Sequence, residues 1–308
     1  MLNDPPPEKR RVHPLEQPSG LTEPTGRRVV EDDEDDAAPD GTGVLRQGQV
    51  LLIIPSVRPL VTYTILAINI AIFIVRALSP AVDQMLFLWG ANHQPDVLLG
   101  GELHRLFTSM FLHASVYNRL GGFALENSLH LIFNAYILWA MGSSLERMVG
   151  HVRFAIIYLL GGLCGSVMSA VLGAPNIYSV GASGAVFAVL GAQFVFLYRH
   201  RKLFGARGRA QMQSVITLVI FNLLLGALTG ISTGPIRVDN WAHLGGAIGG
   251  IVLTWFIGPI YIVGRHPERP NALLAEDINP LRGRWWAVSA VASVLIVSLV
   301  VARGFIYG

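Results

Sequence analysis

Two polar residues, a serine and a histidine, each open a long apolar segment in which neither is expected. Ser183 lies in the string Gly181-x-Ser183-Gly184, directly before the run AVFAVLGAQFVFL, and His243 directly precedes LGGAIGGIVLTWFIG. A reactive or ionisable side chain is costly at membrane depth, and by default it marks a functional site. Because an imidazole can take the proton of a serine hydroxyl and so activate it, the pair predicts nucleophilic chemistry inside a bilayer.

A second pair of polar residues lies in another apolar segment. His130 and Asn134 are four residues apart, so on a helix their side chains share one face. An Asn amide or an imidazole N–H can stabilise the oxyanion that forms during acyl transfer. The same two residues could instead form hydrogen bonds between neighbouring helices, and the pair alone does not decide between these roles.

Glycines recur at helical spacing in the two segments that begin near Ser183 and His243. Small residues let transmembrane helices approach closely, which is their usual role. Here close approach would also bring the serine hydroxyl within reach of the histidine. The glycines expected at this packing are Gly181, Gly184, Gly191, Gly245, Gly246, Gly249 and Gly250.

The composition indicates a membrane protein. Of the 308 residues, 52% are hydrophobic and only 14% are charged, against about 25% charged in ordinary soluble domains. The formal net charge of +3 is too small to indicate a nucleic-acid partner. A single cysteine, Cys164, excludes an intrachain disulfide framework.

Seven apolar segments are each about long enough to cross a hydrocarbon core of ~30 Å, which requires roughly 17–25 helical residues. Backbone groups in lipid must pair internally, so the predicted fold class is all-α, a polytopic membrane helical bundle. The segments are expected near residues 60–78, 129–147, 152–172, 183–200, 213–231, 241–263 and 285–303.

The first fifty residues have a different composition. They are rich in Pro and charge and include the acidic run 31–36. Such a stretch cannot bury enough apolar surface to offset chain ordering, so it is predicted to be a disordered tail, either solvated or regulatory. No apolar region follows its early basic residues, so it is not expected to be a signal peptide.

Basic loops predict the orientation of the bundle. Lys and Arg are concentrated in the connections after the second, fourth and sixth segments, with the strongest cluster at 199–209. Cytoplasmic loops carry such an excess, so the N-terminus is expected in the cytoplasm and the C-terminus outside. Ser183, His243, His130 and Asn134 then all lie a turn or so into the membrane from the outer face.

These motifs, in this order, resemble the rhomboid family of intramembrane serine proteases. The resemblance covers roughly residues 60–263. It implies a six-helix catalytic core (51–263) between the tail (1–50) and a cytoplasmic loop with a seventh helix (264–308). It also implies Ser183 as nucleophile, His243 as its base without a third acid, and His130, Asn134 and the Ser183 N–H as oxyanion donors. The matched string Ala242-His243-x-x-Gly246-x-x-x-Gly250 implies helix packing at the last two glycines.

The resemblance further implies partners and a location. The substrates would be single-span membrane proteins cut near their outer ends, in the plasma (inner) membrane of a prokaryote, with the lipid bilayer as surroundings and no cofactor or metal. The chain departs from the family pattern in two places: an insert at 115–127 before the second helix, and Phe187 where some members stack a tyrosine on the catalytic histidine. Leu145-Glu146-Arg147 is similar to the polar end of the family's second helix, an expected ion-pair site.

Other chemistries and functions find less support in the residues. No His-Glu-x-x-His string is present, and no aspartate lies inside a predicted span, so the zinc and paired-aspartate mechanisms lack their parts. His104 and His113 are expected to be hydrogen-bonded or interfacial, not metal ligands. A non-catalytic rhomboid-like protein that binds transmembrane helices stays open, as does a small-solute transporter, although the polar groups lie near one face and not at the midplane.

Overall fold

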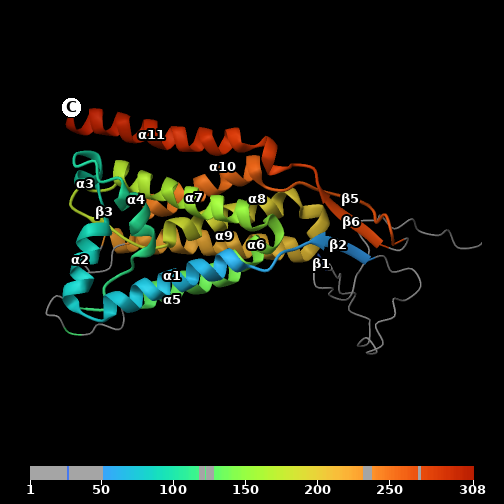
Figure 1. Ribbon diagram of the computed structural model, residues 1–308, viewed down its shortest axis with the longest axis horizontal. Coiled ribbons are helices and arrows are strands. Elements are labelled where there is room, and N and C mark those ends of the chain that lie inside the picture. The colour runs from blue at the N-terminus through green and yellow to red at the C-terminus, as the bar shows by residue number, and fades with distance from the viewer. Residues whose placement is uncertain (1–25, 28–50, 118–121, 123–127, 232–237, 270–271) are drawn as a thin grey trace, which may run out of the picture.

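Seven helical segments run side by side in one bundle (Figure 1). The structure is a computed structural model that describes residues 26–27, 51–117, 122, 128–231, 238–269 and 272–308. The segments are α1 (Leu60–Ala77), α5 (Ser128–Ile137) continued by η3 (Leu138–Gly142) and α6 (Ser143–Val149), α7 (His151–Leu172), α8 (Ser183–Arg199), α9 (Arg201–Ile231), α10 (Asn240–Ile257) and α11 (Trp285–Tyr307). They lie where the sequence predicts helices, and the chain is a polytopic helical membrane bundle.

Four of the described helices are long and apolar enough to cross a membrane by themselves: α1, α7, α9 over Arg201–Leu228, and α11. Helix α8 is apolar but shorter. The second segment is interrupted by η3, a π-helical turn of five residues. Such turns occur as local bulges inside α-helices.

The core of the bundle is formed by α7, α8 and α10. Nearly every residue of α8 after Ser183 is buried, whereas α9 and α11 expose large apolar side chains such as Phe221, Leu228, Val300 and Phe305. An apolar face turned away from protein suits a lipid surrounding. The buried helices α8 and α10 therefore hold Ser183 and His243, and α9 and α11 lie outside them.

Two predicted helix boundaries are wrong. The sixth helix ends at Ile257 and not near 263, because Gly258 leaves the helix and Pro259 cannot continue it. The fifth helix begins at Arg201, inside the predicted basic loop, since Arg, Lys, Ala and Gln are good helix formers. Gly205, with φ 50° and ψ −134°, breaks this helix near its start.

A small sheet, which the sequence did not predict, lies at one end of the bundle, here called the sheet end (Figure 1). Its strand order is β1-β2-β6-β5. Strands β2 and β6 are parallel, and β5 and β6 are antiparallel. The strands are β1 (Gly26–Arg27), β2 (Leu51–Pro55), β5 (Tyr261–Arg265) and β6 (Ala272–Asp277). Strands from both sides of the expected boundary at residue 263 thus join one sheet. The rest of the predicted tail lies outside the described residues.

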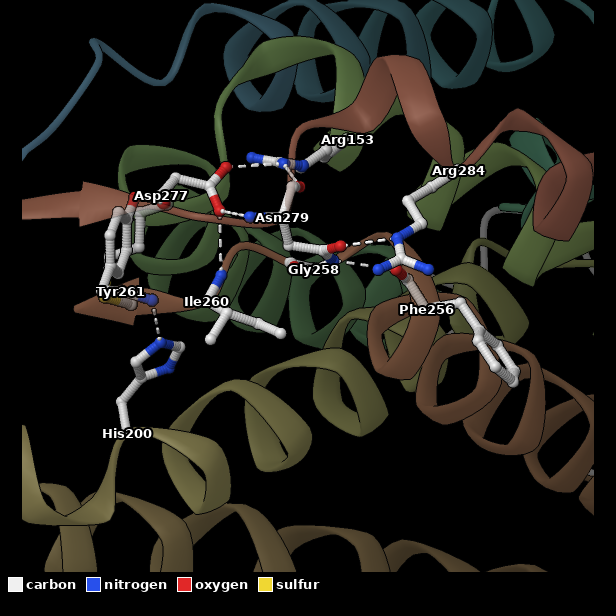
Figure 2. Close-up of polar contacts among 10 residues, drawn as sticks. Arg153, His200, Phe256, Gly258, Ile260, Tyr261, Asp277, Asn279 and Arg284 are labelled. Carbon is white, nitrogen blue, oxygen red and sulfur yellow. Dashed lines mark hydrogen bonds and ion pairs between the residues drawn. The ribbon is translucent and has the colours of Figure 1, made fainter.

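Polar contacts fix the sheet to the bundle (Figure 2). The Asp277 carboxylate accepts hydrogen bonds from Arg153 Nη2 at 2.7 Å and from the Ile260 and Asn279 amides at 3.0 and 2.9 Å. The Asn279 side chain donates to the Gly258 carbonyl and accepts from Arg284 Nε at 2.6 Å. The segment before α11 is therefore held against the ends of α7 and α10.

His200 makes a further link between helices and sheet. Its Nε2 accepts a hydrogen bond from the Tyr261 amide at 3.0 Å, and its Nδ1 lies 2.8 Å from the Phe196 carbonyl. Burial lowers the pKa of His200. A neutral ring with its proton on Nδ1 satisfies both contacts, which joins the α8–α9 turn to β5.

Short elements gather at the opposite end, here called the loop end (Figure 1). They cap α7 there: Asn92 donates to the Ser166 carbonyl at 2.8 Å, and Gln94 donates to the Ala170 carbonyl at 2.9 Å. The elements are α2 (Pro80–Gly90), β3 (Asn92–His93), α3 (Gln94–Leu98), α4 (His104–Thr108), η1 (Ser109–Phe111) and β4 (Tyr178–Ser179). Since β4 pairs with β3, the chain entering α8 is held at this end.

Candidate active site

Ser183 is the first residue of α8, at the loop end. The chain reaches it through Gly181, whose φ of +135° is rarely open to other residues. The Gly181 amide donates to the Ser109 carbonyl at 3.0 Å. A Cβ at Gly181 would lie 2.7 Å from the His130 ring and 3.7 Å from Ser183 Oγ. The imidazole of His130 and the hydroxyl of Ser183 therefore both border the same glycine.

A small cavity of about 10 Å³ lies beside Ser183. Its walls come from η1, α7, α8, α10 and the loop that follows β4. Most of its lining residues are polar or small, with Met110 and Val180 as the exceptions: Ser109, Met110, Gly162, Ser166, Ser179, Val180, Gly181, Ser183, Gly184 and Ala242. A volume of this size holds about one water-sized probe, so the packing below the serine is close.

His243 lies in the first turn of α10 and faces α8. Its ring stacks on Phe187, with centroids 4.1 Å apart and planes 8° from parallel. Phe187 is four residues after Ser183, one turn along the same face of α8. The ring contact expected at Phe187 is therefore present, and it places His243 on the face of α8 that carries Ser183.

Backbone contact between α8 and α10 holds this arrangement. A Cβ at Gly246 would overlap the Gly184 carbonyl, and one at Gly250 would overlap the Ala188 carbonyl. Only glycine permits the two backbones to lie this close. Gly245 and Gly249 face α7 instead, against Cys164. The glycines of α10 thus pack on two helices, not on α8 alone.

His130 and Asn134 both lie on α5, close to the loop end. The Asn134 amide donates to the His130 carbonyl at 2.9 Å, four residues back on the same helix. This leaves the second amide N–H available to another acceptor. The structure therefore brings His130 next to Ser183 and places Asn134 one turn further along α5.

The two outer-loop histidines differ from each other. His104 Nε2 lies 3.0 Å from the Trp89 carbonyl, so this histidine is hydrogen-bonded, as the sequence predicts. His113 is buried, its ring packs edge-on against His130 with centroids 5.4 Å apart, and neither ring nitrogen has a hydrogen-bond partner among the described residues. Burial, with the nearby His130 and Arg76, lowers the pKa of His113 to about 3. His113 is therefore a buried residue that packs against His130.

The insert at 115–127 is described only in part, and its first residues bind the loop end. Ser115 Oγ donates to Asp83 at 2.5 Å, and Tyr117 OH donates to the Ala77 carbonyl at 2.6 Å. Asp83 also pairs with Arg76 at 2.7 Å, and Arg76 donates to the His113 carbonyl at 2.6 Å. The segment that leads to α5 is thereby fixed to α1 and α2.

At the polar end of the second helix, Glu146 pairs with His151 and not with the neighbouring Arg147. Glu146 is fully buried and accepts from the Val61 amide at 2.9 Å and from Thr62. Its ion pair is with His151 Nδ1 at 2.6 Å. Arg147 is exposed instead. The carboxylate thus joins α6 to the starts of α1 and α7.

Asp239 is a residue of the site that sequence reasoning missed. It caps α10 by accepting from the Ala242 amide at 3.0 Å. Its other oxygen accepts from Ser169 Oγ on α7 and Ser179 Oγ on β4, both at 2.5 Å. An aspartate immediately before an apolar helix is an N-cap signal, so the cap could be predicted from the sequence. The two serine partners could not be predicted, since they lie 60 or more residues away.

Loss of the three hydrogen bonds to Asp239 is expected to destabilise the first turn of α10. Asp239→Ala leaves two hydroxyls and a helix amide without their acceptor, so we expect a loss of about 1–3 kcal/mol of stability. Asp239→Asn keeps an acceptor for the cap and should lose less. Thermal unfolding of the purified full chain in detergent measures both. An Asp239→Ala protein as stable as the wild type would show that the three bonds hold nothing together.

The fold and the placement of these residues define a class: a polytopic membrane bundle with a serine and a histidine on facing helices near one end of the bundle. Residues 100–260 match the family model described as Rhomboid domain. The chain belongs to the rhomboid family.

Curated relatives agree with this family. Rhomboid protease GluP of Bacillus subtilis (strain 168) is 32% identical over 203 residues, which are 65% of this chain and 35% of that protein. RHOMBOID-like protein 1 of Arabidopsis thaliana is 36% identical over 196 residues, 62% of this chain and 45% of that protein. RHOMBOID-like protein 6, mitochondrial, from the same plant is 32% identical over 213 residues, 68% and 62% respectively. The matched region thus spans between about a third and three-fifths of these relatives.

Proposed function

We propose that this protein is an intramembrane serine protease that hydrolyses peptide bonds in or near transmembrane segments of other membrane proteins. Ser183 is the nucleophile and His243 its general base. The observation that carries the proposal is the stacking of His243 on Phe187 at 4.1 Å, one helical turn from Ser183, across helices in backbone contact. This arrangement supports proton transfer between the two side chains.

The base acts without a third acid. His243 Nδ1 is buried and has no hydrogen-bond partner among the described residues. In a triad that nitrogen would bond to a carboxylate, which orients the ring. Here the Phe187 ring restricts the imidazole by stacking, so the contact that sets its orientation is apolar. The proposal is therefore a Ser-His dyad.

The reaction needs no group beyond these side chains and water. Ser183 Oγ attacks the scissile carbonyl carbon while its proton passes to His243. The tetrahedral intermediate then expels the amine, which takes the proton from His243, and an acyl-enzyme remains. A water molecule gives a proton to His243 and attacks the ester carbonyl. The intermediate then expels Ser183 Oγ, which takes this proton from His243, and the new carboxyl end is released. Among the described residues no group of three His, Cys, Asp or Glu gathers as a metal site.

Three donors are proposed for the developing oxyanion. The Ser183 N–H is at the start of α8, where backbone amides lack helical acceptors and the helix dipole favours negative charge. The His130 ring lies beside Ser183 across Gly181. Asn134 keeps one amide N–H, and it lies one turn from His130 on α5. Donors fixed before the reaction lower its barrier because they need little reorganisation.

The proposed substrates are single-span membrane proteins, and the proposed orientation follows from the basic residues. Arg199, Arg201 and Lys202 lie at the turn of α8 and α9, at the sheet end. An excess of such residues favours the cytoplasmic side, so the loop end with Ser183 would open to the outer face, with the N-terminus inside and the C-terminus outside. A prokaryotic plasma membrane is part of this proposal.

Asn134→Ala is expected to lower kcat more than it changes KM, because its free N–H bonds chiefly to the transition state. Removal of one oxyanion donor costs on the order of 10²–10³ in kcat, and the two other proposed donors would reduce the loss. Steady-state cleavage at several substrate concentrations separates the two constants. A pure KM effect would assign Asn134 to substrate or helix positioning.

A direct assay tests the function. The purified full chain is reconstituted in liposomes with a single-span test substrate, and the products are located by mass spectrometry. We expect a cut in or near the transmembrane segment, which is unaffected by metal chelators. Binding of the substrate without any cut, by protein shown to be folded, would favour a non-catalytic rhomboid-like protein. Solute flux without a cut would favour a transporter.

A further inference from the structure

An apolar groove of about 520 Å³ lies between α1, α7 and α11. It has no polar lining surface apart from its end, where His151 lies. Branched and small side chains form its walls: Val61, Val152, Ala155, Ile156, Leu159, Leu160, Leu163, Val288 and Ala292. The seventh helix contributes only two of these residues, so along this face α11 does not close against α1 and α7.

The length of the groove corresponds to one leaflet of a bilayer. Its lining on α7 runs from His151 to Leu163, thirteen residues that rise by about 18 Å along the helix. Half of a hydrocarbon core of ~30 Å is about 15 Å. The groove begins at the sheet end, at the first residue of α7, and ends near the middle of the bundle. A single acyl chain of the leaflet on that side fits this extent.

An imidazole and two arginines are exposed where the groove begins. The ring of His151 has Nδ1 engaged by Glu146, while 39% of the side chain is exposed. Arg147 is exposed, and its carbonyl accepts from the Val57 amide at 3.2 Å, which brings Arg58 to the same place. Glu146 itself is fully buried and saturated with donors. The described surface around the groove end is therefore net basic.

Aromatic side chains mark this depth as the membrane interface. Trp285 and Trp286 begin α11, and both are about half exposed. Tryptophan concentrates at membrane–water interfaces, where headgroups lie. Val288, one turn beyond them, already lines the groove. The basic groups thus lie at headgroup depth and the groove at acyl-chain depth.

We propose that this groove binds one anionic phospholipid of the surrounding bilayer. An acyl chain fills the space between α7 and α11, and the phosphate contacts Arg147, Arg58 and His151 Nε2. Basic residues near a membrane surface attract anionic lipids. The acyl chain of the lipid would complete the packing of α11 against the core. The groove stops at Leu163, about nine residues before the end of α7 at the loop end, and it is independent of the proposed protease activity.

Lipid retention by the intact protein tests the proposal. The purified full chain is equilibrated in mixed micelles of detergent with equimolar phosphatidylglycerol and phosphatidylcholine, and bound lipid is counted by native mass spectrometry. We expect one phosphatidylglycerol retained in preference to phosphatidylcholine. Arg147→Gln should lower the retained phosphatidylglycerol about fivefold, the contribution of one basic group near a surface. Arg265→Gln, an exposed arginine on β5, serves as the charge control and should change nothing.

A second pair of variants tests the groove itself. Ala292→Phe narrows the groove and should lower retention without altering charge, whereas Ala290→Phe lies on the exposed side of α11 and should leave retention intact. Equal retention of the two lipids by the wild type would mean non-specific annular lipid only. Unchanged retention in Ala292→Phe, with the protein folded by thermal unfolding, would place any bound lipid elsewhere. Either result overturns the proposal.

Discussion

Ser183→Ala is expected to abolish cleavage of a transmembrane substrate, and His243→Ala is expected to do the same. Where nucleophile and base act as a unit, removing either one costs on the order of 10⁶ in kcat. Ser183 is only partly buried, so its hydroxyl adds little to packing and the alanine protein should fold normally. Cleavage by purified variants, at matched concentration in the same liposomes, gives the two rates.

Ser298→Ala is the matched control for Ser183→Ala. That hydroxyl is on α11 and donates only to the Val294 carbonyl of its own helix, at 2.8 Å. It should cleave like the wild type. Robust cleavage by purified Ser183→Ala would contradict the proposed mechanism, because no other residue has been assigned the role of nucleophile.

Gly246→Ala is expected to lower activity by about 10²-fold, although it changes no catalytic atom. The added methyl would overlap the Gly184 carbonyl, so α8 and α10 must move apart. A displacement of ~1 Å between reacting groups can cost about this factor. Because Gly184 follows Ser183 directly, the displacement occurs at the dyad itself. The rate is measured on folded protein with the same substrate.

Gly304→Ala gives the comparison for this substitution. It places the same methyl on a transmembrane helix, α11, where no other atom lies within 4 Å of the new carbon. Its activity should equal that of the wild type. If Gly246→Ala cleaves as fast as the wild type, α8 and α10 do not pack closely at this position. The separation of Ser183 and His243 would then not depend on their contact.

The sequence predicted the helices and the grouping of the polar residues because both depend on local signals. Length and hydropathy located the seven helical segments, and helix periodicity put Phe187 on the face of Ser183. The direction of each segment then placed Ser183, His243 and His130 at one end. These inferences need no knowledge of which helices touch.

What the sequence did not predict depends on contacts between distant segments. Strands β2 and β6 are short and pair across more than 200 residues, so neither pattern nor length marks them. Tyr261–Arg265 continues the apolar run of α10, and only the three residues Gly258, Pro259 and Ile260 separate helix from strand. The serine partners of Asp239 and the hydrogen bonds from Val61 and Thr62 to Glu146 likewise come from tertiary packing.

The most direct test of the Ser183–His243 dyad is labelling with a serine-directed acylating or phosphonylating probe. The wild-type protein and His243→Ala are treated in parallel, and the modified peptide is identified by mass spectrometry. The dyad predicts one adduct, on Ser183, in the wild type, and its loss in His243→Ala, because the hydroxyl then lacks a base. An adduct on a different serine, or equal labelling of Ser183 in both proteins, would contradict the assignment of Ser183 and His243 as nucleophile and base.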